Sequence, residues 1–145
     1  MNWQTEAALA GRVLAAAVLG GIVGWQREHM GIEAGVRTYA GVALGACVFG
    51  LISFQVAGDS RIAANIAPGI GFLCAGVILR QEGHITGLTT AATLWATAAI
   101  GLAVADAKLI FAFSVTVILY VLLAIPLKKW EHRNVDPHLN DPPRH

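Results

Sequence analysis

Five long stretches of the chain consist almost entirely of apolar residues, and this pattern restricts the fold more than any other feature. The stretches span residues 7–25, 39–57, 62–79, 88–105 and 109–127. A helix needs about 20 apolar residues to cross the ~30 Å hydrocarbon core of a bilayer. Only 13% of the 145 residues are charged, whereas a soluble domain carries about 25%. The sequence therefore predicts an all-α, polytopic integral membrane protein with about five transmembrane helices.

The ends of these stretches divide the chain into a membrane domain and a tail. We predict a transmembrane domain over residues 1–127 and a short cytoplasmic tail over residues 128–145, whose Asp, Pro, Asn and His content indicates disorder. The residues before the first stretch contain no Lys or Arg, so they lack the positive region of a cleaved signal peptide. The first stretch is therefore expected to remain in the protein as a helix.

The third stretch has two interpretations. It contains Asn65, Pro68, Gly69 and Gly71, which are residues that weaken or interrupt a helix. It fits an ordinary crossing helix that begins near Pro68, because proline is tolerated in the first turn. It also fits a broken or re-entrant segment, which a membrane accepts where protein or a polar cavity covers the free backbone groups.

Lys and Arg residues are distributed unevenly among the connections between the stretches. The second and fourth connections carry two, Arg61 and Lys108. The first connection, the third connection and the tail carry seven: Arg27, Arg37, Arg80, Lys128, Lys129, Arg133 and Arg144. Because cytoplasmic loops hold the excess of positive charge, we predict that the C-terminus lies in the cytoplasm and the N-terminus outside.

Small residues recur four positions apart within the stretches. Such spacing lets transmembrane helices approach closely, which matters because lipid removes most of the hydrophobic drive for helix association. The candidate packing residues are Gly20, Gly24, Gly41, Gly45, Gly71 and Ala75. They fit packing within one copy of the chain or between copies, and we expect a homo-oligomer in the lipid bilayer, with a dimer favoured.

Most of the charges gather at the ends of the stretches in clusters of mixed sign. The clusters are Arg27, Glu28, Glu33 and Arg37; Asp59 and Arg61; and Arg80, Glu82 and His84. They fit ordinary solvated loops or a functional site, since charges at a membrane edge are usually paired or line a polar path. Arg12 lies inside the first stretch, where its side chain reaches outward to water or pairs with Asp106 or Asp59. Thr89 and Thr90 begin the fourth stretch, where they cap the helix or bind a ligand.

The positions of the histidines and serines do not fit a catalytic site. All five histidines lie outside the apolar stretches, and the three serines have no neighbouring base, so we predict that the protein is not an enzyme. A net charge of +1 without a continuous basic stripe gives no reason to expect nucleic-acid binding. Cys47 and Cys74 both lie in apolar stretches, which favours packing over a disulfide or a metal pair.

Several sequence blocks follow one another in a recognisable order. The blocks are Gly24-Trp25-Gln26-Arg27-Glu28, Ala34-Gly35-Val36-Arg37-Thr38, Arg61-Ile62-Ala63-Ala64-Asn65, Gly69-Ile70-Gly71-Phe72-Leu73, Ala75-Gly76-Val77-Ile78 and Gly87-Leu88-Thr89-Thr90-Ala91-Ala92-Thr93-Leu94-Trp95. Together with Asp59 and the later Ala98-Ala99-Ile100-Gly101, they resemble the MgtC/SapB family of membrane proteins over residues 10–125. The chain is similar to the short, SapB-like members, without the cytosolic ACT-like domain that many relatives carry.

The resemblance implies a protein of the bacterial cytoplasmic (inner) membrane that is linked to adaptation to low magnesium and, in some pathogens, to virulence. It implies a small membrane regulator acting on other membrane machinery, with the F-type ATP synthase as a candidate partner. The functional residues that the family's motifs place on this chain are Arg27, Glu28, Arg37, Thr38, Asp59, Arg61, Asn65, Thr89 and Thr90.

The alternative function is transport of Mg²⁺ or another small solute. The third stretch and the polar start of the fourth would then line a path, with Asp59 as an outer ligand and Glu28 or Glu82 as an inner ligand. Mg²⁺ takes an octahedral shell of oxygens and keeps several waters, so one or two carboxylates could serve. No carboxylate lies in the middle of a stretch, and no resident cofactor is predicted besides this candidate ion.

Overall fold

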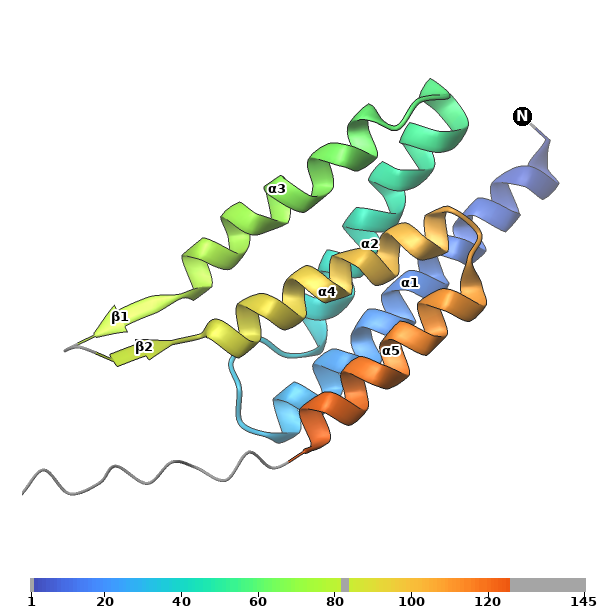
Figure 1. Cartoon of the computed structure of the whole chain (residues 1–145). Helices are drawn as coiled ribbons and strands as arrows, with labels where there is room; N and C mark the ends of the chain where they lie inside the picture. Colours follow the sequence, from blue (N-terminus) through green and yellow to red (C-terminus); the bar gives the residue numbers. More distant parts are fainter. Residues whose placement is uncertain (1, 82–83, 126–145) are drawn as a thin grey trace, which may run out of the picture.

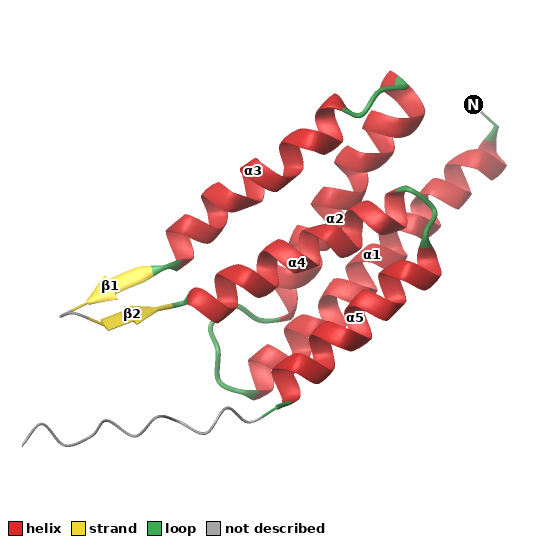
Figure 2. Ribbon diagram, viewed as in Figure 1, coloured by secondary structure: helices red, strands yellow, loops and turns green. Residues whose placement is uncertain are grey.

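The computed structural model describes residues 2–81 and 84–125. These residues form five α-helices: α1 (Trp3–His29), α2 (Val36–Leu51), α3 (Arg61–Val77), α4 (Leu88–Ala105) and α5 (Leu109–Ala124). A π-helical turn, η1 (Ile52–Ala57), continues α2, and two short strands, β1 (Leu79–Gln81) and β2 (His84–Thr86), connect α3 to α4 (Figure 1, Figure 2). The strands pair antiparallel, with Arg80 opposite Ile85, in the connection between the third and fourth apolar stretches.

Successive helices run in opposite directions, so the connections lie at the two ends of one bundle (Figure 1). The N-terminus, the α2–α3 turn and the α4–α5 turn lie at one end, which we call the N-terminal end. The α1–α2 connection, the β-hairpin and the last turn of α5 lie at the other, which we call the hairpin end. α4 lies at the centre and contacts the other four α-helices, and eleven of its 18 residues are buried.

The prediction of an all-α membrane protein with about five helices is confirmed. α4 has the predicted bounds, while α1 and α2 begin a few residues before the predicted stretches. Among the described residues, three helical segments are long and apolar enough to cross a membrane: Trp3–His29, Val36–Gln55 and Leu88–Ala105. α3 and α5 are apolar but shorter, with 17 and 16 residues. The predicted tail, residues 128–145, lies outside the described residues.

The third stretch forms one uninterrupted helix, α3, with Pro68 in its interior. The expectation that this helix begins near Pro68 is wrong, because two side chains from the preceding segment accept hydrogen bonds from its first turn. Asp59 Oδ1 accepts from the Arg61 amide at 3.0 Å, and Ser53 Oγ accepts from the Ala63 amide at 3.1 Å. Groups that satisfy the free N–H donors of a first turn stabilise a helix start at that point, so α3 extends from the N-terminal end to the hairpin end.

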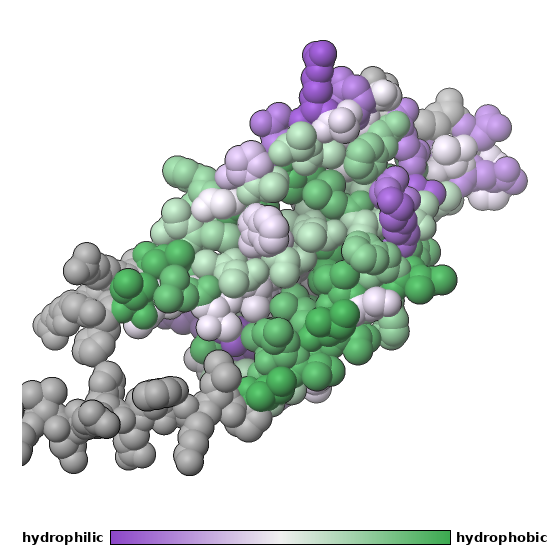
Figure 3. Space-filling model, viewed as in Figure 1, coloured by the Kyte–Doolittle hydropathy of each residue, from purple (hydrophilic) through white to green (hydrophobic). Residues whose placement is uncertain are grey.

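Large hydrophobic side chains face outward from the sides of the bundle. Ile110 is 86% exposed and Phe72 is 83% exposed, and Phe111, Phe113 and Ile118 of α5 are each more than half exposed. Figure 3 shows hydrophobic residues covering α5 and hydrophilic residues gathered at the N-terminal end. A soluble protein rarely exposes so much contiguous apolar surface, and a lipid bilayer would cover it.

Glycines hold α1, α2 and α4 close together. A Cβ at Gly20 would lie 2.6 Å from the carbonyl oxygen of Tyr39, and one at Gly24 would meet the start of α2 nearly as closely. A Cβ at Gly101 of α4 would overlap the carbonyl oxygen of Ala43 of α2. Larger residues at these positions would push the helices apart, so glycine permits the backbone contact on which this core depends.

Candidate functional site

A chain of buried polar side chains joins α1, α2 and α4 toward the hairpin end. The Tyr39 hydroxyl lies 2.5 Å from Thr93 Oγ1, and Thr93 Oγ1 donates to the carbonyl oxygen of Thr90 at 3.0 Å. Arg27 Nη2 donates to Thr90 Oγ1 at 3.1 Å. All four side chains are buried, and we call Arg27, Tyr39, Thr90 and Thr93 the polar network.

Two buried polar atoms in and beside this network have no hydrogen-bond partner among the described residues. They are Gln26 Oε1 and Arg27 Nε, and the two residues are 7% and 6% exposed. Gln26 Nε2 donates to the carbonyl oxygen of Tyr120 at 3.0 Å and so ties α1 to α5. A buried polar atom without a partner costs roughly 1–3 kcal/mol, and such atoms are rare in native proteins. Their presence marks the hairpin end of α1 as a candidate functional region.

The other motif residues at the hairpin end are exposed. Arg37, Thr38 and Thr89 lie on the surface at the starts of α2 and α4. Glu28 is also exposed, and its Oε2 accepts a hydrogen bond at 3.2 Å from the amide of Val36, the first residue of α2. A carboxylate in this place satisfies a free N–H group and interacts favourably with the helix dipole. Glu28 therefore caps α2.

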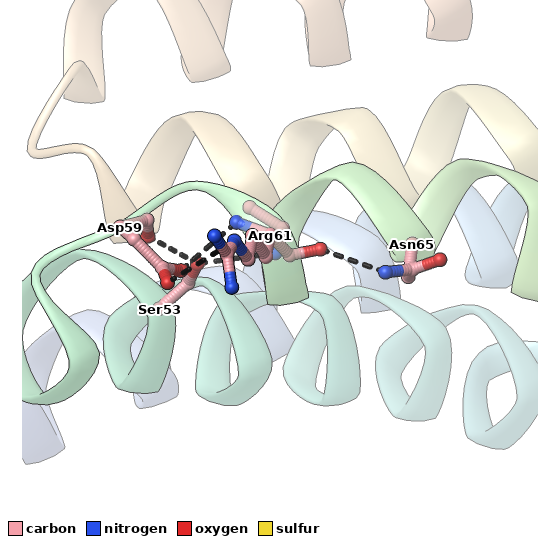
Figure 4. A network of polar contacts seen from close by, with 5 residues as sticks. Ser53, Asp59, Arg61 and Asn65 are labelled. Atoms are coloured by element: carbon pink, nitrogen blue, oxygen red, sulfur yellow. Dashed lines mark hydrogen bonds and ion pairs between the residues drawn. The ribbon is translucent and has the colours of Figure 1, made fainter.

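The remaining motif residues form a second polar cluster, at the α2–α3 turn of the N-terminal end (Figure 4). Ser53 is fully buried and donates to the carbonyl oxygen of Asp59 at 2.7 Å. Asp59 Oδ2 lies 3.9 Å from Arg61 Nε, and Asn65 Nδ2 donates to the carbonyl oxygen of Arg61 at 2.8 Å. Because Asp59, Arg61 and Asn65 are exposed, their bonds shape the turn and the start of α3. The structure thus divides the motif residues between the two ends of the bundle.

Arg12 does not pair with either predicted carboxylate. Its Nη1 donates at 3.2 Å to the carbonyl oxygen of Ala105, the last residue of α4, while Asp106 forms an ion pair with Lys108 at 2.7 Å. A cation near the C-terminal end of a helix interacts favourably with its dipole. Arg12 therefore links α1 to the end of α4.

The predicted magnesium ligands do not lie together. Glu28 is in the last turn of α1, at the hairpin end, and Asp59 is in the α2–α3 turn, at the N-terminal end. Glu82 lies outside the described residues. Over residues 2–81 and 84–125, no three His, Cys, Asp or Glu side chains are grouped so that they could hold a metal ion. Each carboxylate could therefore supply only part of the shell of a hydrated ion.

A groove of about 570 Å³ lies between α2 and α3. Its walls include Gly41, Gly45 and Gly69, and an added Cβ at any of the three would meet no other atom of the described segments within 4 Å. The other wall residues are mostly apolar, with Thr38 and Asn65 as polar exceptions. We call this cavity the α2–α3 groove.

The predicted packing residues therefore differ in what they contact. Gly20 and Gly24 contact α2 within the chain, whereas Gly41 and Gly45 face the groove. Gly71 also has open space around it, and Ala75 is exposed. The residues of the second and third helices are thus available for contact with lipid or with another protein.

Four buried polar residues of these two regions, Gln26, Tyr39, Ser53 and Thr93, were not predicted as candidates. Gln26 and Tyr39 lie at the ends of apolar stretches, next to charged or polar residues. A polar residue is ordinary in such a place, and tyrosine is common at the membrane surface. Ser53 lies between Ile52 and Phe54 in a mostly apolar run, and a polar residue so placed usually finds a partner. That placement was the one local signal for Ser53, whereas the contacts of Tyr39 depend on how α2 packs against α4.

Comparison with known proteins places the described features within one family. A model of the MgtC family matches residues 13–132. Protein MgtC of Brucella abortus (strain 2308) is 45% identical over 104 residues, which cover 70% of this chain and 44% of that protein. Protein MgtC of Salmonella typhimurium (strain 14028s / SGSC 2262) is 53% identical over 91 residues, which cover 61% of this chain and 39% of that protein. The chain thus matches less than half the length of these relatives, and no solved structure gives a significant match.

Proposed function

The chain belongs to the MgtC family, and we propose that it is a multi-pass protein of the bacterial inner membrane that regulates other membrane machinery during adaptation to low magnesium. The hairpin end would face the cytoplasm, since it holds Arg27 and Arg37 and the sequence assigns most other Lys and Arg residues to the same side. The residue range matched by the family model includes both polar clusters and the α2–α3 groove.

The observation that carries this proposal is the open, glycine-lined wall of the α2–α3 groove. No other atom of the described residues lies within 4 Å of a Cβ added at Gly41, Gly45 or Gly69, so another backbone can approach closely there. In a bilayer, small residues allow the close van der Waals contact and interhelical hydrogen bonds that drive helix association. We therefore assign the groove to a transmembrane helix of a partner protein, with Thr38 and Asn65 as polar contacts.

The family resemblance makes the F-type ATP synthase the candidate partner. Co-purification of the synthase with the tagged chain tests this association. Gly41→Leu and Gly45→Leu fill the groove and are expected to abolish association with the partner. Leucine favours helix over glycine by roughly 0.8–1 kcal/mol, so both variants should still insert and fold. Gly11→Leu is the matched control, because Gly11 is an equally open glycine on α1, outside the groove.

The tagged wild type and the Gly11→Leu control are expected to retain the synthase in membranes from cells grown at low magnesium. Association that survives both groove substitutions would contradict this assignment. Two copies of the chain with different tags test self-association in the same membranes. Loss of self-association alone would assign the groove to a second copy, and the protein would then be a homo-oligomer through this surface.

Transport of Mg²⁺ is less well supported, because Asp59 and Glu28 lie at opposite ends and the groove walls are mostly apolar. Proteoliposomes with an inward Mg²⁺ gradient test it. We expect no Mg²⁺ entry above that of empty liposomes when the protein is folded and inserted. Entry that the Asp59→Asn substitution removes would make the chain a transporter and overturn the proposal.

A further inference from the structure

Arg27 is a buried cation without a counter-charge among the described residues. The residue is 6% exposed, and its Nε atom is buried with no hydrogen-bond partner in the described part of the chain. The ion pairs within the described part of the chain both lie at the N-terminal end, away from Arg27. A buried charge is strongly unfavourable unless an opposite charge or several hydrogen bonds compensate it. Within residues 2–81 and 84–125, the guanidinium group therefore has no anion beside it.

The same guanidinium lies at the positive end of α4. Thr90 is the third residue of that helix, so the hydrogen bond from Arg27 Nη2 to Thr90 Oγ1 places the guanidinium beside the first turn. The first N–H groups of a helix have no partner within the helix and carry a partial positive charge. The Arg27 guanidinium and the first-turn N–H groups of α4 thus lie next to each other, and a bound anion would stabilise both.

The residue before α4 cannot supply a side chain that would cap the first-turn amides of this helix. Gly87, the N-cap, has a φ of +84° and forms no side-chain cap. A Cβ at Gly87 would overlap the carbonyl oxygen of Val77, so the Asp, Asn, Ser or Thr that commonly caps a helix does not fit. Glu28 follows Arg27 in the sequence, but it is exposed and its carboxylate accepts from the amide of Val36.

We propose that Arg27 and the first turn of α4 form a binding site for a phosphate-type oxyanion. The guanidinium supplies positive charge and N–H donors, the first-turn amides favour an anion, and the hydroxyls of Thr89 and Thr90 add donors. Thr89 is exposed, so the site opens at the surface of the hairpin end. Two sources offer this chemistry there: the headgroup of an anionic phospholipid and inorganic phosphate in the water.

The melting temperature of the full chain in lipid nanodiscs tests the site and distinguishes the sources. One arm compares nanodiscs of phosphatidylcholine with nanodiscs that also contain phosphatidylglycerol. The other adds inorganic phosphate to phosphatidylcholine nanodiscs at constant ionic strength. A ligand that binds only the folded state raises the melting temperature, and we expect a rise of about 3 °C or more in at least one arm. A rise in one arm alone identifies the source.

Two variants and a control connect the response to Arg27. Arg27→Gln is expected to lose the response, while Arg37→Gln, which removes an exposed arginine at the same end, should keep it. Thr89→Glu places a carboxylate in the first turn of α4. It is expected to raise the melting temperature in pure phosphatidylcholine and to remove the response to added anion. This variant decides the question even if Arg27→Gln fails to fold.

Three outcomes would overturn the site. The first is a wild type that responds in neither arm. The second is a response that Arg37→Gln reduces as much as Arg27→Gln does, since that would indicate general surface electrostatics. The third is a Thr89→Glu variant that is no more stable than the wild type in phosphatidylcholine and responds as fully to added anion.

Discussion

Replacing Tyr39 by phenylalanine is expected to destabilise the wild-type protein but to stabilise a variant that already carries Thr93→Val. The reason is the direction of the hydrogen bonds in the polar network. A threonine hydroxyl has one proton, and Thr93 gives its proton to the carbonyl oxygen of Thr90. Tyr39 is therefore the donor and Thr93 Oγ1 the acceptor in the 2.5 Å contact between them.

The expected magnitudes follow from which group each substitution leaves unpaired. Tyr39→Phe removes a donor while Thr93 keeps its own bond, so it should cost about 0.6 kcal/mol, the average for an interhelical hydrogen bond in a bilayer. Thr93→Val leaves the hydroxyl of a fully buried tyrosine without an acceptor, which costs about 1–3 kcal/mol. In the double variant no polar group of the pair is left, so adding Tyr39→Phe to Thr93→Val should recover part of that loss.

Reversible unfolding in mixed micelles, followed by circular dichroism, measures the four free energies of this cycle. Thr116→Val is the matched control, because Thr116 is buried and donates only to the carbonyl oxygen of Ala112 in its own helix. Tyr39→Phe and Thr116→Val should therefore be additive. The reasoning is refuted if Tyr39→Phe destabilises the protein equally in the wild-type and Thr93→Val backgrounds.

Two further predictions concern helix contacts. Gly101→Ala is expected to lower the free energy of unfolding by about 1–3 kcal/mol, because the added methyl group would overlap the carbonyl oxygen of Ala43. Gly41→Ala, at an open helical position, should instead raise the free energy of unfolding by up to ~1 kcal/mol. Chemical unfolding measures both variants, and a Gly101→Ala variant that is more stable than the Gly41→Ala variant would contradict the observed packing. Glu28→Gln should lower the free energy of unfolding by about 0.3–1 kcal/mol, because it weakens the cap on Val36. This loss should shrink at high salt, and a salt-independent loss would count against the electrostatic cap.

The apolar pattern was enough to predict the helices, while their exact starts depend on contacts that the pattern does not contain. α4 has its predicted bounds because Gly87 and Asp106 interrupt the apolar run on either side. α3 begins at Arg61 rather than near Pro68, because side chains from the preceding segment accept its first amides. A helix start that relies on such partners cannot be found from helix-breaking residues alone.

The residues of the candidate site were predictable by type, but their partners were not. Arg27 and Thr90 were both predicted as functional candidates, yet their hydrogen bond joins positions 63 residues apart and follows from the packing of α1 against α4. The spacing of small residues likewise predicts that a helix face is closely approached, but it does not identify the helix that approaches it. Gly20 contacts α2 within the chain, whereas Gly41 faces an open groove.

The shallow packing of α3 has a consequence for how the bundle opens. Only Ile66 and Cys74 of its 17 residues are buried, and Pro68 cannot donate the hydrogen bond that would continue the helical ladder. A segment with so few buried contacts unfolds locally at a lower free energy than the whole protein. α3 should therefore separate as a cooperative unit while α1, α2, α4 and α5 stay folded, with its amide hydrogens exchanging before those of α4. Because α3 forms one wall of the groove, a helix bound there would slow this exchange by holding the wall in place.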